Sequence, residues 1–467
     1  MAQKYSMPVA SWLTGHLTDL QPAKLAFMER CEREFPIGCF RIYHIPLFVV
    51  SHPELVGEVL VHRNDDFIKT WVLRSAARPL FGDGLVTSSG ETWKRNSSRM
   101  RPRFQPRQVD SYVPAIRQHT ERLLDEWKAG DKRDIPLDMS HLTLRIACDT
   151  LFGVGELEVR DALLCACDAS QAFYWNWERT YWPLPALMPT RANVRYRSAI
   201  RALDRCIYEL IERRRRTGGA SDGNIVAQLL NHRDPDGTPM PDRAIRDELV
   251  TLFLAAYETT AAVLAWTLYL ISTHRDVEAR VKAELVDVLG GAPTGPDAAE
   301  RLPYLYNVLR ESLRLYPSIP IFGRAAVRNT RIGGTDVPKG AEVLISPWAI
   351  QRSPRHYHDP IAFKPERWTP EFERSLPRHA YLPFSAGPRV CLGQHMAVQE
   401  SMQILATLLQ FAELRAIEEQ RPVLDVGMTA VPRRGTLTLQ IRALNKPHAQ
   451  IRSHVDRGLG VAQETAN

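Results

Sequence analysis

The chain has 467 residues, with 44% apolar and 24% charged side chains and a formal net charge of +7, as in an ordinary globular protein. A basic surface suits nucleic acid, an anionic membrane or an acidic protein partner. No lysine-rich run or nucleic-acid module is present, so a nucleic-acid partner is not expected. The seven cysteines are odd in number and lack a framework spacing, which favours a reducing, cytoplasmic compartment.

The chain is predicted to be mainly α with a small β region. Residues 1–20 have neither a secretory signal nor a membrane anchor and are expected to be loosely ordered. A single domain is expected over residues 21–443, followed by a frayed tail at 444–467. Strands are predicted within 40–50, with a turn at Ile45-Pro46, and at 330–332, 341–345 and 436–441; helices at 113–127, 197–216, 249–272, 276–289, 304–315 and 393–411; and an irregular run at 353–389.

The segment 249–272 is long and apolar enough to span a membrane and is interrupted only by Glu258. A mid-span Glu-Thr-Thr cluster would be costly in lipid. A helix that is apolar all round is also typical of the centre of a large soluble protein. We therefore expect a buried core helix.

The most informative segment surrounds one cysteine. Phe384, Gly387, Arg389, Cys391 and Gly393 form the pattern F-x-x-G-x-R-x-C-x-G. Taken without context, a lone cysteine in a turn is usually a buried free thiol. The spacing, however, resembles the haem-binding loop of the cytochrome P-450 family and matches it at every defined position.

This resemblance implies the cytochrome P-450 haem-thiolate fold and haem b with Cys391 as the axial ligand to iron. A thiolate ligand pushes electron density toward the iron and favours O–O cleavage. The glycines would let the backbone approach the sulfur and the haem, and Phe384 would exclude water. Trp93, Arg324 and Arg389 match positions that bind the haem propionates. Where the family has a further arginine, this chain has Ser97.

The implied reaction inserts one oxygen atom from O₂ into a hydrophobic small molecule, such as a terpenoid, fatty acid or polyketide-like compound, as in the hydroxylations of secondary metabolism. The chain ends soon after its last predicted strand, so electrons are expected from a separate ferredoxin- or flavodoxin-type donor. Alternatives are a haem-thiolate peroxygenase, isomerase or coupling enzyme, and a non-catalytic protein that binds haem or an apolar ligand.

Glu311 and Arg314 stand three residues apart and share a helix face. An exposed pair of this kind would contribute little to stability. The resemblance instead pairs them with Arg367, in a P-E-R-W segment, as a buried network that fixes the irregular run before Cys391.

The predicted core helix contains an acid and a hydroxyl in Ala256-Tyr-Glu258-Thr259. In the family such a pair delivers protons beside the oxygen site, and Glu258 is expected to connect Thr259 to solvent. The family has a glycine where this chain has Ala256, which weakens the case for a widened, water-filled groove. The competing interpretation is a polar pair at a helix break.

Two surfaces complete the expectations. The substrate pocket should draw on residues 67–73, 254–259, 318–322 and 428–431, which are chiefly apolar. A basic face could attract an acidic electron donor, or be an ordinary solvated face; its members are Lys94, Arg95, Arg99, Arg101 and Arg103. Cys165 and Cys167 are expected to be core or helix-surface thiols.

Overall fold

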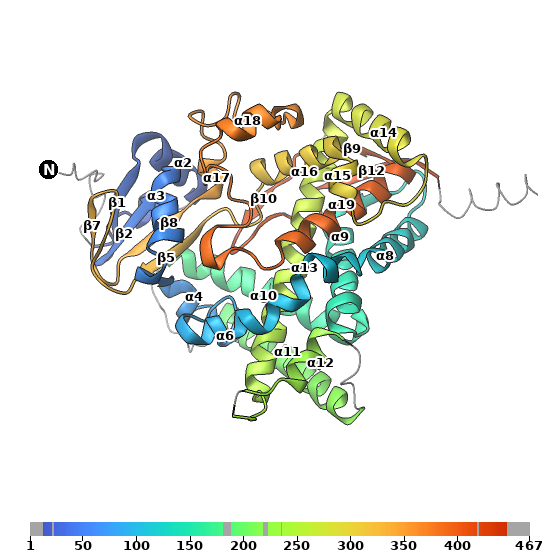
Figure 1. Cartoon of the computed structure of the whole chain (residues 1–467). Helices are drawn as coiled ribbons and strands as arrows, with labels where there is room; N and C mark the ends of the chain where they lie inside the picture. The colour runs from blue at the N-terminus through green and yellow to red at the C-terminus, as the bar shows by residue number, and fades with distance from the viewer. Residues whose placement is uncertain are drawn as a thin grey trace, which may run out of the picture.

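The computed structural model of the chain describes residues 13–20, 23–180, 188–217, 223–234, 236–417 and 420–445. The expectations for the first twelve residues and for the tail beyond residue 445 fall outside this part. Within it, the mainly α fold with a small β region is confirmed (Figure 1).

The largest sheet has five strands in the order β1 (Ile37–Ile42), β2 (Ile45–Val50), β8 (Glu342–Ile345), β5 (Phe322–Ala326) and β3 (Phe67–Lys69). Strands β2 and β8 are parallel, and the other neighbours are antiparallel. The predicted turn at Ile45-Pro46 was wrong. Tyr43 has a positive φ of 52°, so the chain reverses at Tyr43 and His44 and the strand already begins at Ile45.

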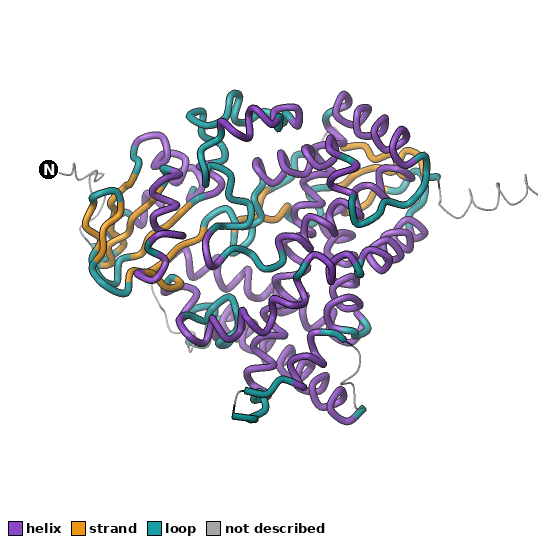
Figure 2. The backbone as a smooth tube through the Cα atoms, viewed as in Figure 1, coloured by secondary structure: helices purple, strands orange, loops and turns teal. Residues whose placement is uncertain are grey.

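The remaining strands form three small sheets (Figure 2). One has the order β4 (Lys132–Asp134), β12 (Thr438–Leu444) and β9 (Ala412–Ala416). The other two are the pairs β10 (Leu424–Val426) with β11 (Ala430–Pro432), and β6 (Thr330–Ile332) with β7 (Thr335–Val337). The turn between β10 and β11 reaches the central cavity through Met428.

Helices make up the rest of the ordered core. Those before the central helix are α1 (Leu17–Leu20), α2 (Lys24–Glu34), α3 (Pro53–Gly57), α4 (Trp71–Ser75), α5 (Arg78–Phe81), α6 (Gly90–Met100), α7 (Pro106–Asp110), α8 (Val113–Glu126), α9 (Ile135–Ala147), α10 (Glu156–Thr180), α11 (Arg191–Arg216) and α12 (Ile225–Asn231). Those after it are α14 (Arg275–Leu289), α15 (Ala298–Arg301), α16 (Pro303–Leu315), α17 (Pro347–Ile350), α18 (Pro370–Ser375) and α19 (Gln394–Phe411).

The central helix α13 (Asp242–Thr273) is 32 residues long and crosses the middle of the molecule (Figure 1). It is long and apolar enough to cross a membrane, but 78% of the residues in its most apolar 18-residue stretch are buried inside the fold. It packs against α9, α11, α16 and α19. Its lack of a polar face therefore reflects burial on all sides by other helices.

Candidate active site

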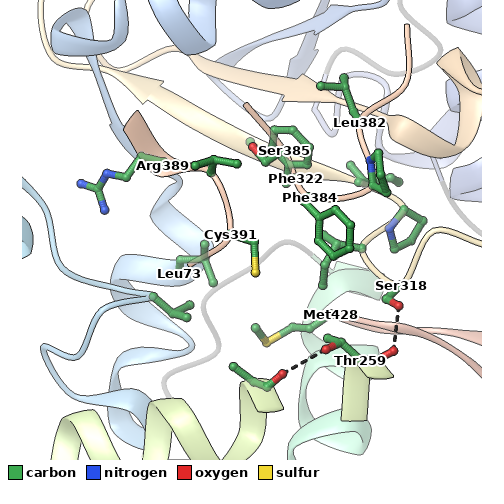
Figure 3. A pocket seen from close by; sticks show the side chains of 18 of the residues that line it. Leu73, Thr259, Ser318, Phe322, Leu382, Phe384, Ser385, Arg389, Cys391 and Met428 are labelled. Carbon is green, nitrogen blue, oxygen red and sulfur yellow. Dashed lines mark hydrogen bonds between the residues drawn. The ribbon is translucent and has the colours of Figure 1, made fainter. Parts of the chain in front are cut away.

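A cavity of about 520 Å³ lies between the loop that carries Cys391 and the middle of α13. Figure 3 shows the sulfur of Cys391 pointing into this space, with Thr259 on the opposite side. Leu73, Phe384 and Met428 are among the apolar side chains around it. Cys391, which was predicted to hold a haem iron, and Thr259, one of the two residues predicted to handle protons, thus face one cavity.

The loop around Cys391 is shaped by backbone contacts. The Cys391 N–H donates to the Phe384 carbonyl at 3.0 Å, and the Gly393 N–H bonds to the thiol, which lowers its pKa. Burial acts more strongly in the other direction and raises that pKa overall. Gly387 has a φ of +72°, and a Cβ there would lie 2.0 Å from the Leu60 carbonyl oxygen, so no side chain fits.

Behind this loop, Glu311, Arg314 and Arg367 are brought together as hydrogen-bonded partners. Glu311 and Arg314 are completely buried, and Arg314 donates to both carboxylate oxygens at 2.8 and 2.9 Å. Arg367 Nε donates to the same carboxylate at 2.9 Å, and Trp368 Nε1 donates at 3.0 Å. Every charge in this buried cluster therefore has a partner, as burial requires.

The cluster connects to the cysteine loop through Gln351. Arg314 donates to the Gln351 carbonyl at 2.7 Å, and the Gln351 side-chain oxygen accepts the Leu382 N–H at 2.7 Å. Tyr357 donates to the Ala380 carbonyl at 3.1 Å. These bonds hold the start of the segment that leads to Cys391.

One edge of the cavity gathers three cations. Lys69 is paired with Arg324 across β3 and β5, and Arg389 lies over the Trp93 ring at 4.0 Å and donates to the Ser88 carbonyl at 2.9 Å. Burial, then Arg324 and Arg389, hold the pKa of Lys69 well below its usual range. Burial lowers the pKa of Arg324 to about 10, and burial and Arg324 lower that of Arg389 to about 10.

Among the described residues, no carboxylate forms an ion pair with any of these three cations. Buried positive charges without a counterion are costly, and a ligand with carboxylates at this edge would relieve that cost. A haem carries two propionates on one edge, so the cation edge and the Cys391 sulfur together fit this group. From the sequence, Lys69 was expected only within the apolar pocket stretch 67–73, because its pairing with Arg324 depends on the sheet register.

Trp93 and Ser97 both line the cavity. The Ser97 hydroxyl accepts a hydrogen bond from Arg101 Nε at 3.3 Å. Arg99 instead donates to His232 and Asp234. No arginine of α6 thus points to the edge where the three cations meet.

On the opposite wall, α13 continues without interruption through Ala256 and Thr259, so the break considered for this position is absent. The Thr259 hydroxyl donates to the Ala255 carbonyl at 3.0 Å. The Ser318 hydroxyl donates to the Thr259 carbonyl at 2.9 Å, as Figure 3 shows. Ser318 thereby ties the chain before β5 to the centre of α13.

The Glu258 side chain is half-buried and does not line the cavity with Thr259. Its carboxylate accepts hydrogen bonds from Cys167 Sγ at 2.9 Å, Gln171 Nε2 at 3.2 Å and Thr429 Oγ1 at 3.0 Å. Successive residues on a helix point about 100° apart, so an acid next to Thr259 faces another direction. Glu258 therefore joins α10 and the β10–β11 turn to α13.

All four stretches predicted for the pocket contribute, and the stretch 318–322 does so at every residue. The lining residues from them are 69–73, Ala255, Ala256, Thr259, 318–322 and Met428. The cavity also extends to Leu20, Met28, Leu47 and Leu344, which were not predicted. Leu20 and Met28 lie on α1 and α2, and Leu47 and Leu344 on β2 and β8, so these positions come together only through tertiary packing.

Most of the predicted basic face is already bound to other residues. Lys94 pairs with Glu91 at 2.8 Å, Arg99 with Asp234, Arg101 with Ser97, and Arg103 with Gln228 at 2.7 Å. Arg95 is exposed. Of the predicted cysteines, Cys165 is exposed and Cys167 is buried.

The family model for cytochrome P450 matches residues 6–436. The cyclooctat-9-en-7-ol 5-monooxygenase of Streptomyces melanosporofaciens is 34% identical, with 87% of this chain and 88% of that protein covered. The pentalenene oxygenase of Streptomyces avermitilis is 31% identical, with 93% and 97% covered. The crystal structure of the cytochrome P450DA haem domain has a TM-score of 0.81 at 27% identity and covers 94% of this chain and 98% of its own.

Proposed function

We propose that this chain, which belongs to the cytochrome P450 family, hydroxylates a terpenoid. Members of this family are oxidoreductases that incorporate oxygen, and the chain is one of them. The observation that carries the proposal is the Cys391 sulfur facing Thr259 across an apolar cavity. Relatives named for cyclooctat-9-en-7-ol and pentalenene support the substrate class. Terpenoids have large apolar bodies, which suit a cavity lined by Leu73, Phe384 and Met428.

In this proposal the Cys391 sulfur would hold the iron of haem b, and Lys69, Arg324 and Arg389 would hold its propionates through charge-assisted hydrogen bonds. Haem supplies the activation of O₂, with one oxygen atom entering a C–H bond and the other leaving as water. Phe384 and the apolar wall exclude water from the sulfur.

Thr259 is placed to hold a proton donor at its hydroxyl, because that group lines the cavity and its backbone is fixed by Ser318. Glu258 supplies protons only after its carboxylate leaves Cys167, Gln171 and Thr429. Proton delivery is thus coupled to movement of α10 or of the β10–β11 turn.

The electron donor is a separate ferredoxin- or flavodoxin-type protein in the cytoplasm. Its acidic surface would meet the exposed Lys94 and Arg95 on α6. Residues 21–443 form the single catalytic domain.

The test is a haem-loaded preparation assayed with a ferredoxin, its reductase, NADPH and a panel of terpene hydrocarbons and alcohols. We expect ligand-induced spin-state shifts and a hydroxylated product whose new oxygen comes from ¹⁸O₂. Incorporation from labelled water, or binding of no terpenoid, would contradict the proposal.

A peroxide-driven reaction is the second candidate, and the placement of Glu258 favours it. Its carboxylate is held outside the cavity by three donors, whereas oxygen delivered as peroxide needs fewer protons. Product formation with hydrogen peroxide that exceeds product formation with the ferredoxin system would select this candidate.

A further inference from the structure

Beyond the space between Cys391 and Thr259, the cavity has an outer arm. It passes the end of β3 and reaches the face of the five-stranded sheet that packs against α2. Leu20, Met28, Leu47, Trp71 and Leu344 line this arm. It is apolar except for a few groups, of which Glu342 on β8 is an acid.

The alternation of side chains along a strand decides which charges Glu342 can meet. Glu342 is paired with Leu47 on β2 and with Ala325 on β5, so these three side chains share one face. Arg324 is paired with Val343 and with Lys69, so these share the other face. Lys69 and Arg324 therefore lie on one face of the sheet, at the cavity edge with the three cations, and Glu342 lies on the other face, in the outer arm.

Only one carboxylate oxygen of Glu342 has a hydrogen-bond partner within the described residues. Oε1 accepts the Trp71 N–H at 2.9 Å, at the start of α4. Burial raises the pKa of Glu342 to about 7, against the opposing effects of the Trp71 N–H and of Arg74. Capping α4 needs one oxygen, so the second is available to a ligand.

We infer that Glu342 accepts a hydrogen bond from a hydroxyl group at the end of the substrate that lies farthest from Cys391. This inference rests on the proposed function and narrows its substrate class to terpene alcohols. Glu342 is half-buried, and an acceptor in such a place that gains a donor recovers part of its desolvation cost, while the apolar lining holds the hydrocarbon body.

The surrounding charges favour a neutral donor. Lys24 lines the same arm, and Arg74 acts on Glu342 through space, so an ammonium ligand would approach two cations. A carboxylate ligand would meet the negative charge that Glu342 carries above its pKa of about 7. An alcohol has neither difficulty and costs less to bury than an ion.

The experiment uses the full haem-loaded chain and four probes with one terpene skeleton: farnesol, β-farnesene, farnesylamine and farnesoic acid. Binding is followed by the haem spin state. We expect farnesol to bind about tenfold more tightly than β-farnesene, the gain typical of a hydrogen bond to a charged group. Farnesylamine and farnesoic acid should both bind more weakly than farnesol.

In Glu342→Leu the preference for farnesol should disappear, while the affinity for β-farnesene stays the same. Glu342→Gln keeps an oxygen for the Trp71 N–H and should retain part of the preference, which separates ligand recognition from folding. Glu400→Gln changes the other carboxyl residue of the cavity lining and should leave the preference intact.

An unchanged ratio of farnesol to β-farnesene affinity in Glu342→Leu overturns the inference and leaves the proposed function standing. Farnesoic acid that binds more tightly than farnesol also overturns the inference, because the ligand would then be recognised by Lys24 in the same arm. Tighter binding of farnesylamine overturns the hydroxyl assignment. If none of the four probes shifts the spin state, the terpenoid substrate class fails together with this inference.

Discussion

The Cys391 side of the cavity and the α13 side place their polar groups differently. Behind Cys391, Glu311 is bonded to Arg314, Arg367 and Trp368 in a buried cluster. On α13, the Thr259 hydroxyl bonds to its own helix, and the Glu258 carboxylate is bound to α10 and the β10–β11 turn. The first side is fixed through interlocked charges, whereas the second depends on contacts between elements that can separate.

This difference indicates where the protein needs rigidity. A metal ligand must stay in one geometry, and a saturated network of buried charges has few alternative arrangements. Proton delivery needs a group that changes partners, and neutral donors such as Cys167 and Thr429 hold Glu258 less strongly than an arginine would.

The most severe test of the Cys391 side is removal of the sulfur. Cys391→Ala should lose the thiolate-type spectrum of the reduced carbon monoxide complex and all NADPH-dependent turnover, because no other described cysteine lines the cavity. The exposed Cys165 provides the control, since Cys165→Ala should keep both. A retained thiolate spectrum in Cys391→Ala would refute the assignment of the ligand.

The next largest effect should follow from breaking the charge network. Glu311→Gln leaves Arg314 and Arg367 buried without a counterion, and loss of one partner of such a pair costs roughly 3–5 kcal/mol. Denaturant unfolding measures this loss of stability, and the haem content of the purified variant shows whether the site still forms. The control is Glu373→Gln, which breaks a more exposed pair with Arg310 and should cost about 1 kcal/mol or less. Equal losses of stability in the two variants would show that the buried cluster does not stiffen the Cys391 side.

On the α13 side, Thr259→Ala should lower product formed per NADPH by about a hundredfold, the scale of a lost proton donor. Substrate binding should change little, because the backbone bond to Ser318 remains. The spin-state titration and product yield together separate the two effects. Thr273→Ala, at the exposed end of the same helix, should be neutral. Fully coupled turnover in Thr259→Ala would mean that this hydroxyl handles no proton.

The smallest effect concerns Glu400 on α19, whose Oε1 is buried and has no hydrogen-bond partner among the described residues. Burial raises its pKa from 4.5 to about 8. The folded chain then holds a proton that the unfolded chain releases, so this group lowers stability as the pH rises from about 5 to about 8. Glu400→Gln should flatten this part of the pH profile of Tm. An unchanged slope would show that Glu400 ionises normally.

Local spacing in the sequence is sufficient to predict part of the site. The pattern around Cys391 needs only a turn and a helix start, and Glu311 and Arg314 need only one helix face. The apolar run around Glu258 indicated a buried helix before any packing was known. Short-range geometry is sufficient for each of these, because the backbone between the residues has few allowed forms.

Which residues meet across the cavity depends on long-range packing. The cation edge requires β3 and β5 to pair Lys69 with Arg324, and a shift of one residue would send these side chains to the other face. The direction of Glu258 depends on Cys167 and Gln171 from α10 and on Thr429 from a distant turn. The outer arm with Glu342 likewise exists only where strands far apart in sequence lie side by side. Such contacts follow from register and packing, for which no local pattern in the sequence is sufficient.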